Sequence, residues 1–415
     1  MKRSMKTAPI DLADTELFVS GDPFAAWKWL RQNAPVYWTH DGHGGGSWAL
    51  TRYEDVLRVY LDDVTFSSVE GAVMGGSYRK QRDSASGKML ICTDPPRHRL
   101  LRQQLRQGFS PLMLERIKVC IRGLVEPALD QVLAEGGCDF AADVAPLLPT
   151  GVLMAMLGLS KPEAGRILDL TRTMIGFGDA EWGAGRAESA VLVRSQAEIL
   201  AFFAEILERR RREPGDDLIS LLLRSEIKGK RMTEAEILYN CMNVAVGGNE
   251  TTPSTACGGV LALIEYPDEA QRLAADPSLL PKAVEEILRW TSTNAYVQRL
   301  GTRDVEIHGQ RILAGQAVTL WNPSANRDED IFADADRFDV AREPNRHVAF
   351  GAGRHHCIGQ TVARCEISIL LERLLAQGVR FRLDAPVERL RSNFMLGIKH
   401  LPVAVADRRQ EGWHE

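Results

Sequence analysis

A lone cysteine near the C-terminal end of the chain lies in a glycine-rich loop. Residues 350–359 read FGAGRHHCIG, and a helical pattern begins directly after them. A cysteine thiolate is the soft anionic ligand that donates electron density to a bound metal. Glycines let the backbone approach the sulfur, while backbone N–H groups and the positive end of the next helix temper its charge. We therefore expect Cys357 to be a metal ligand; the alternative is a buried structural thiol.

A second chemical signal lies in the middle of a long helical pattern, which starts at the capping box TEAE of residues 233–236. Residues 247–253 read GGNETTP. Two glycines weaken a helix by ~1 kcal/mol each, and Pro253 lacks the N–H that would bond the carbonyl of Asn249. We expect a local opening at which Glu250 and Thr251 form an acid–alcohol pair that relays protons. The alternative is a kinked core helix with a buried polar cluster.

The cysteine loop resembles the haem-binding signature of the cytochromes P-450, FxxGxxxCxG. The matching positions are Phe350, Gly353, Cys357 and Gly359. The resemblance implies haem b as the cofactor and Cys357 as the axial ligand of its iron. It also implies that His355 binds a haem propionate.

Other motifs of that family occur in family order along the chain. The GGNET segment resembles the oxygen-activation motif (A/G)Gx(D/E)T, which implies that Gly248 borders the haem and that the acid–alcohol pair is catalytic. His98 and Arg102 lie four residues apart in a helical pattern opened by DPP, so they share one face. They resemble the propionate-binding HxxxR pair, and Arg299 matches the third propionate ligand. Without that context, His98 and Arg102 would read as a solvated basic face.

A third motif has an implied role in scaffolding. Glu286 and Arg289 form an ExxR, and residues three apart on a helix can pair. The resemblance implies a buried charge network, completed by Arg337 in the segment ADRFD, that locks the loop presenting the cysteine. We expect His347 to be structural or near a propionate, and His356 to point outward.

The composition is that of an ordinary globular protein with an ample core. Of 415 residues, 45% are hydrophobic and 26% charged, and 51 basic against 55 acidic side chains give a net charge of −4. This charge gives no case for nucleic-acid binding. Seven dispersed cysteines favour reduced cytoplasmic thiols over a disulfide framework. We expect no apolar run that approaches the ~18 residues of a membrane span, no signal peptide, and hence a cytoplasmic protein without a membrane partner.

The elements that must position these residues are mostly helices. A hairpin is predicted around the DGHGGG turn, and a strand-rich stretch is predicted to begin at residue 298. The resemblance implies a mainly α fold with a small β-rich lobe, organised as one cytochrome P-450 domain over residues 1–415. It also implies that loop 65–92 roofs the substrate pocket and that the glycine-rich link at 176–185 forms its lid. Candidate pocket residues are Met74, Tyr78, Met89, Leu90, Ile91, Met174, Phe177, Trp182, Asn240, Asn243, Val244, Thr293, Ala295, Val297, Phe394, Met395 and Leu396.

The implied function is haem-thiolate monooxygenation, in which O2 and two electrons oxidise an apolar organic intermediate by hydroxylation or epoxidation, in secondary-metabolite biosynthesis. Electrons are expected from a ferredoxin and its reductase, with Arg97, Arg106 and Arg354 as docking contacts, and the protein is expected to be a monomer. One alternative is an oxidase of the same fold acting on a substrate tethered to a carrier protein. Another is a non-catalytic haem sensor or carrier, which the intact Glu250–Thr251 pair disfavours.

Overall fold

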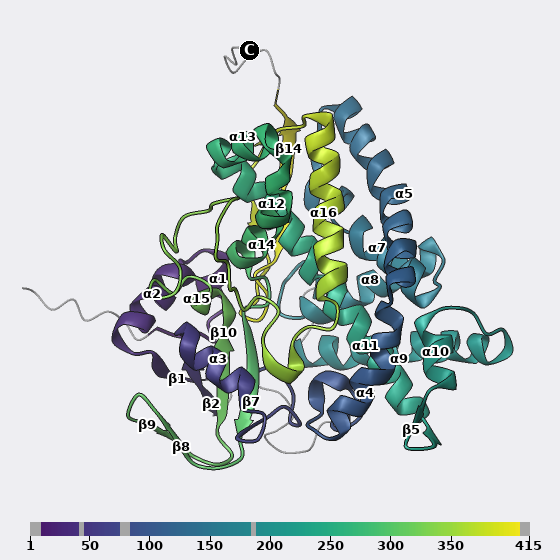
Figure 1. Cartoon of the computed structure of the whole chain (residues 1–415), viewed down its shortest axis with the longest axis vertical. Helices are drawn as coiled ribbons and strands as arrows, with labels where there is room; N and C mark the ends of the chain where they lie inside the picture. Colours follow the sequence, from purple (N-terminus) through teal and green to yellow (C-terminus); the bar gives the residue numbers. More distant parts are fainter. Residues whose placement is uncertain (1–9, 41–44, 75–83, 184–187, 407–415) are drawn as a thin grey trace, which may run out of the picture.

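The computed structural model describes residues 10–40, 45–74, 84–183 and 188–406. Figure 1 shows a large helical body with a smaller lobe of strands and short helices at its side. This arrangement confirms the mainly α fold with a small β-rich lobe that the sequence predicts.

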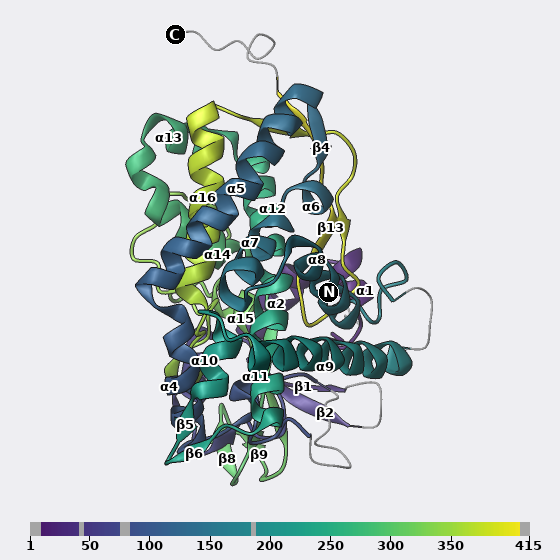
Figure 2. The ribbon, with the colours of Figure 1, turned by 90° about the vertical axis from the view of Figure 1, so that its right-hand side faces the viewer.

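The helical body packs apolar helix faces against one another. In α5 (Pro111–Glu135), the buried residues Ile117, Ile121, Val125 and Leu129 recur every four positions and so form one stripe. The side chain of Ser110 caps the start of α5, and Gly136 ends it with φ 82°. Figure 2 shows α9 (Glu188–Arg212) crossing below α5 and α16 (Gln360–Gln377). The other long helices of the body are α7 (Leu147–Leu157), α8 (Lys161–Ile175), α11 (Glu234–Asn249), α12 (Thr251–Glu265) and α14 (Leu280–Thr291).

The β lobe is built on one five-stranded sheet with the order β1-β2-β10-β7-β3. The predicted hairpin pairs Val36 with Leu50, β10 adds parallel to β2, and β7 adds antiparallel to β10. An aromatic cluster around Trp27 and Trp321 joins the lobe to α2 (Pro23–Asn33). The strands are β1 (Val36–His40), β2 (Gly46–Leu50), β3 (Phe66–Ser67), β7 (Tyr296–Gly301) and β10 (Ala317–Trp321).

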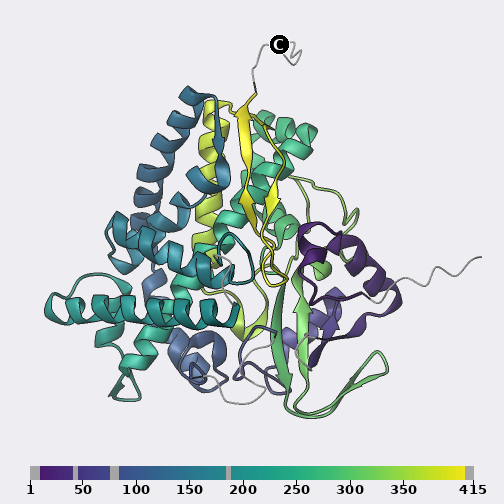
Figure 3. The same cartoon turned by 180° about the vertical axis from the view of Figure 1, so that it is seen from behind.

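The remaining elements are short. Figure 3 shows the C-terminal strands, in yellow, lying on the helical body with helices on both sides of them. The helices are α1 (Glu16–Val19), α3 (Tyr53–Leu61), α4 (Arg97–Arg106), α6 (Phe140–Asp143), α10 (Leu218–Arg224), α13 (Pro267–Ala275) and α15 (Asn322–Ala325), and the 3-10 turns are η2 (Leu90–Cys92), η3 (Gln107–Phe109), η4 (Pro277–Leu279) and η5 (Gly353–His355). The strands are β4 (Gly137–Asp139), β5 (Glu226–Ile227), β6 (Lys230–Arg231), β8 (Val305–Ile307), β9 (Gln310–Ile312), β11 (Phe381–Leu383), β12 (Glu388–Arg389), β13 (Ile398–His400) and β14 (Pro402–Val405).

The stretch Phe140–Leu157 corrects one expectation from the sequence. Its length and mean hydropathy of 1.6 are those of a membrane span, although no such run was expected, and 67% of it is buried inside the protein. Phe140, Leu148 and Leu153 belong to the main hydrophobic core. Packing of α6 and α7 in that core therefore accounts for the apolar character of the segment.

Candidate functional site

The cysteine loop holds Cys357 between η5 and the start of α16. The N–H of Cys357 donates to the carbonyl of Phe350 at 3.0 Å, which closes the loop. Gly353 has φ 67°, and a Cβ there would lie 2.5 Å from the carbonyl oxygen of Tyr60, so the position requires glycine. Burial raises the pKa of the Cys357 thiol. The backbone N–H groups of Gly359 and Gln360 and the guanidinium group of Arg102 lower this pKa, but by less. The loop thus presents a shielded sulfur with donors directed at it.

Four basic side chains gather beside this loop. The rings of His98 and His355 are 4.1 Å apart between centroids, and Arg299 is 4% exposed. Arg102 donates through Nη2 to the carbonyl of His356 at 2.6 Å. None of the four forms an ion pair with another residue in the described part of the chain.

The chemistry of this basic cluster suits an anionic group. Burial lowers the pKa of His98 to about 4 and that of His355 to about 2, with the neighbouring arginines adding to the effect. His98 Nε2 is buried without a hydrogen-bond partner among the described residues. An unpaired buried polar atom is costly, and two carboxylates brought by a cofactor would satisfy this donor set. The four side chains therefore fit the propionates of a haem whose iron would be ligated by Cys357.

The predicted helix opening is present at Glu250. Helix α11 ends at Asn249, α12 starts at Thr251, and Glu250 between them has φ −117° and ψ −24°. A Cβ added at Gly247 or Gly248 would meet nothing within 4 Å, so this face of the helix borders open space. Thr251 Oγ1 donates to the carbonyl of Gly247 at 2.6 Å, which fixes the hydroxyl at the opening.

Glu250 is buried with a partner that the sequence analysis missed. Its Oε1 accepts from Arg172 Nε at 3.3 Å, and the Arg172 guanidinium lies over the ring of Trp182. Burial raises the pKa of Glu250 to about 7, while Arg172 opposes the shift. This carboxyl is therefore poised to exchange a proton near neutral pH. Arg172 lies in the last turn of α8 and carries no spacing signal that would connect it to residue 250.

A second buried acid, Glu366, was also missed. It lies on α16 and accepts from Thr252 Oγ1 at 3.3 Å, while its Oε1 has no partner among the described residues. Burial raises its pKa to about 8. A signal existed in the sequence, because Val362, Glu366 and Leu370 are spaced by four and share the buried face of α16. A carboxylate on an otherwise apolar helix face indicates a functional or specially paired group.

The ExxR motif forms the buried network that was predicted, but with a different third member. Glu286 and Arg289 are fully buried and pair through two hydrogen bonds of 2.7 Å. The third charge is Arg342, whose Nε lies 3.1 Å from both carboxylate oxygens of Glu286. Arg337 is 64% exposed and pairs with Glu269, so its predicted role was wrong. It contributes its backbone carbonyl, which accepts from Arg289 and Arg342.

His347 and His356, on either side of the start of the cysteine loop, each contact a neighbouring polar side chain. His347 Nε2 lies 3.1 Å from Glu285, which also binds Arg364, so His347 is structural. His356 is partly buried and its Nδ1 lies 3.0 Å from the side chain of Gln360, so it does not simply point outward as expected.

Two predicted pocket segments pair directly with each other. Asn294 forms an isolated β-bridge with Met395, and the N–H of Ala295 donates to Phe394 at 3.0 Å. The N–H of Leu396 donates to the carbonyl of Thr293 at 2.8 Å in the same way. Segments 293–297 and 394–396 therefore form one wall, in which Val297, Phe394 and Leu396 remain partly exposed.

The other predicted pocket residues come from the roof loop, α8, the lid link and α11. Met89 and Leu90 are buried at η2, which packs against α11, while Ile91 is 37% exposed. Met174 is buried at the end of α8, and Phe177, Trp182, Asn243 and Val244 are partly exposed. Asn240 is fully buried and its side chain accepts from the N–H of Leu90 in the predicted roof loop. Tyr78 lies outside the described residues, and Met74 donates its N–H to the hydroxyl of Tyr296.

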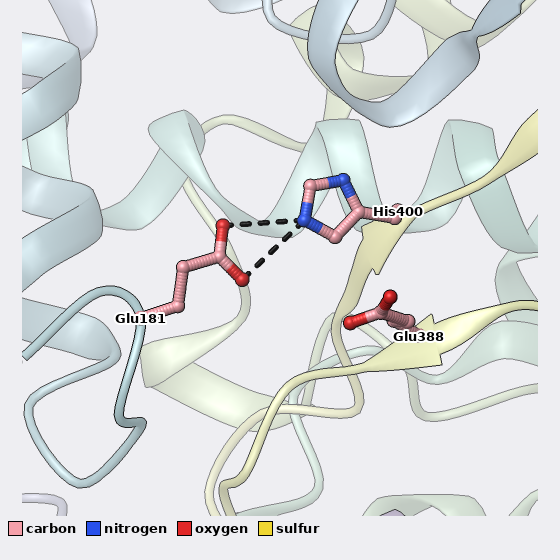
Figure 4. A group of neighbouring side chains, drawn as sticks. All are labelled: Glu181, Glu388 and His400. Carbon is pink, nitrogen blue, oxygen red and sulfur yellow. Dashed lines mark hydrogen bonds and ion pairs between the residues drawn. The ribbon is translucent and has the colours of Figure 1, made fainter.

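The described part of the predicted lid link, residues 176–183, is tethered to the C-terminal strands. Asp179 is 4% exposed and accepts from Lys399 Nζ at 3.2 Å and from the N–H of Arg391 at 3.1 Å. Figure 4 shows Glu181 facing His400 Nε2, with distances of 3.2 and 3.3 Å, and Glu388 alongside. Ligand atoms of these three residues lie within 4.8 Å of one another, a spacing compatible with a metal ion. Lys399 lies 2.9 Å from Glu181 and already supplies positive charge there, so the group serves as an ion-pair tether.

Comparisons with known proteins agree with this geometry. The family model described as Cytochrome P450 matches residues 189–399. A Steroid C26-monooxygenase of Mycolicibacterium smegmatis is 35% identical, covering 96% of this chain and 97% of the relative. The crystal structure of P450 OxyD, involved in the biosynthesis of vancomycin-type antibiotics, has a TM-score of 0.86 and 32% identity, covering 96% of this chain and all of that chain. P450BioI, solved with an acyl carrier protein bearing hexadec-9Z-enoic acid, has a TM-score of 0.83 and 27% identity, covering 94% of this chain and all of that chain.

The signature loop, the basic cluster and the helix opening occur in one chain that matches these relatives over nearly its full length. The chain therefore belongs to the cytochrome P450 family, as a monooxygenase that uses haem b.

Proposed function

We propose that the protein oxidises an apolar organic intermediate of secondary metabolism by hydroxylation or epoxidation, with Glu250 and Thr251 delivering the protons. When bound, the haem supplies the redox chemistry that activates O2 with two electrons and transfers one oxygen atom to the substrate. The observation that carries the proposal is the helix opening, where a buried carboxyl with a pKa of about 7 adjoins a hydroxyl held over open space.

The protein residues have separable tasks in this proposal. Cys357 anchors the cofactor, and His98, Arg102, Arg299 and His355 orient it through its carboxylates. Gly353, Gly359 and Gly248 allow close approach of the backbone, while Phe350 packs against the core and accepts the hydrogen bond that closes the cysteine loop. Glu250 is present in both protonation states near neutral pH, so it can give up a proton and regain one, and Arg172 stabilises its charged form.

The proton-delivery role is tested with Thr251→Ala. We expect this variant to keep its haem but to consume oxygen without matching product, because the hydroxyl at the opening is lost. Thr173→Ala is a matched control, since Thr173 also donates to the carbonyl four residues earlier, but on α8. Product formed per O2 consumed is the measurement. Coupling at the wild-type level in Thr251→Ala contradicts the assignment.

The proposed substrate class rests on the residues around the pocket. Their described members are predominantly apolar: Met89, Leu90, Ile91, Met174, Phe177, Val244, Ala295, Val297, Phe394 and Met395, with Asn243 among them. The relatives named above act in steroid oxidation and antibiotic biosynthesis, which supports an apolar substrate of moderate size. The test is an optical titration of the haem protein with steroids, terpenoids, polyketides and peptides, in which the substrate class shifts the spin state.

A carrier-tethered substrate is the second candidate, favoured by the similar structure solved with an acyl carrier protein. Each compound of the titration is therefore offered free and loaded on a carrier protein. A spin shift with a free compound supports the first candidate, and a shift with the loaded carrier alone supports the second.

We also propose that the chain acts as one cytoplasmic P450 unit, as a monomer, with electrons from a ferredoxin and its reductase. Among the docking contacts predicted from the sequence, Arg106 is exposed, Arg354 pairs with Asp63, and Arg97 pairs with Glu236. Arg106→Glu is expected to slow reduction by an acidic ferredoxin without changing the haem spectrum. Unchanged reduction across ionic strengths argues against this docking site.

A further inference from the structure

The first turns of α11 carry a buried polar side chain directly under the pocket roof. Asn240 is 0% exposed, and the neighbouring Ile237 and Cys241 belong to the hydrophobic core. Its Oδ1 accepts from the N–H of Leu90 at 2.9 Å, and its Nδ2 donates to the carbonyls of Lys88 at 2.8 Å and Glu236 at 2.7 Å. One amide group therefore joins α11 to two backbone groups of a loop 150 residues away.

Two neighbouring residues of α11 hold the same loop and the helix that follows it. The Tyr239 hydroxyl donates to Ser84 Oγ at 2.7 Å. Glu236 closes the capping box with Thr233 and also pairs with Arg97 at the start of α4. Asn240 is the central member, because its bonds reach the backbone beside Met89 and Leu90.

The chemistry of this contact explains why an amide occupies the position. Leu90 offers a buried donor and Lys88 an acceptor, and an amide is the short uncharged side chain that supplies both complements. Removal of the amide would leave the N–H of Leu90 buried without its partner. The bonds go to the backbone, so they fix where the loop runs regardless of its side chains.

We propose that Asn240 is a positioning residue that fixes the distance between the roof segment 88–91 and α11. This distance in turn determines the size of ligand that the pocket admits. The proposal rests on the proposed function in one respect, that this segment faces the substrate. It extends the expectation from sequence, in which Asn240 was a candidate lining residue.

The structural part is tested by hydrogen exchange of residues 84–92 in the haem-loaded protein. In Asn240→Leu all three bonds are lost, so we expect exchange there to accelerate by about five- to tenfold. Asn240→Asp keeps an acceptor for Leu90 but places a carboxyl oxygen against the carbonyls of Lys88 and Glu236, so we expect exchange to accelerate in this variant as well. Tyr239→Phe removes the exposed hydrogen bond to Ser84, so we expect faster exchange of the amides next to Ser84. This variant provides a second measurement if Asn240→Leu does not fold. Wild-type exchange in Asn240→Asp, together with unchanged exchange in the other variants, overturns the proposal.

The functional part is tested with two haem ligands of different size. Imidazole and a bulky aryl-imidazole are titrated optically against wild type and the Asn240 variants. We expect imidazole affinity to stay within about twofold, while affinity for the bulky ligand changes at least about fivefold, because only the latter reaches the roof. Equal effects on both ligands would indicate a general structural defect and overturn the positioning role. These readouts need no turnover, so they stand or fall separately from the coupling test on Thr251.

Discussion

The corrected charge network makes a sharp prediction about two arginines five residues apart. Arg342→Met removes a buried partner of Glu286, whereas Arg337→Met removes an exposed side chain whose backbone carbonyl stays in place. If the network is as described, the first change destabilises the fold strongly and the second hardly at all. The two variants share the same chemical substitution, so each controls for the other.

The size of the effect follows from the bonds that Arg342 makes. Besides Glu286, it donates to the carbonyls of Ala333 at 2.6 Å, Asp334 at 3.1 Å and Arg337 at 2.8 Å. Loss of one partner of a buried charge costs about 3–5 kcal/mol. An exposed ion pair contributes about 0–1 kcal/mol. The unfolding entropy of a chain of this length is about 0.9 kcal/mol/K, so the midpoint should fall by about 3–6 °C for Arg342→Met and by about 1 °C or less for Arg337→Met.

The assay is thermal unfolding of the haem-loaded proteins, followed in parallel by far-UV circular dichroism and by the Soret band. The Soret band should be lost at the lower temperature in Arg342→Met, because the network braces the segment that leads into the cysteine loop. Equal shifts in the two variants, or a larger shift in Arg337→Met, would show that Arg342 is not the third charge of the network.

Three further predictions concern buried acids and the lid. Burial raises the folded-state pKa of Glu250 to about 7 and that of Glu366 to about 8, above their ordinary values, so the folded state holds extra protons and stability should fall as pH rises through about 4.5–8. In Glu250→Gln the pH dependence of the unfolding midpoint should weaken over about pH 4.5–7, and in Glu366→Gln over about pH 4.5–8; an unchanged slope in both variants contradicts the assigned shifts. Lys399→Met should speed both association and dissociation of a bulky azole several-fold in stopped-flow measurements, because the lid tether is weakened, whereas Lys28→Met in an exposed pair should change neither. Product formation by Glu250→Gln should lose its pH dependence near 7, which a pH profile of coupling would reveal.

Local chemistry was predictable from the sequence. Glycine spacing around Cys357 and the GGNETTP break depend on residues close in the chain, and so does the capping box at Thr233, which the structure contains. In each case backbone conformation follows from neighbours within a few positions. The strands that pair across the β lobe could be located but not ordered, since β2 and β10 are joined by a long-range parallel pairing.

Partners supplied by distant segments were not predictable. Arg172 reaches Glu250 from another helix, and the amide of Asn240 reaches a loop 150 residues away. The choice between Arg337 and Arg342 depends on which way a turn points its side chains, and spacing in the sequence does not encode that. The apolar segment 140–157 was underestimated because Asp143, Pro146 and Pro149 interrupt its apolar run, and the structure divides it into two helices. Each of these contacts depends on which side chains meet in space, and a single sequence does not show that.

Ligation of a haem by the Cys357 thiolate is tested by the absorption spectrum of the reduced protein under CO. Wild type and Cys365→Ser should both show the red-shifted Soret band of a haem–thiolate, since Cys365 lies eight residues after Cys357, on α16, and packs against the core. Cys357→Ser should lose that band. If a thiolate-type band persists in Cys357→Ser, Cys357 is not the ligand.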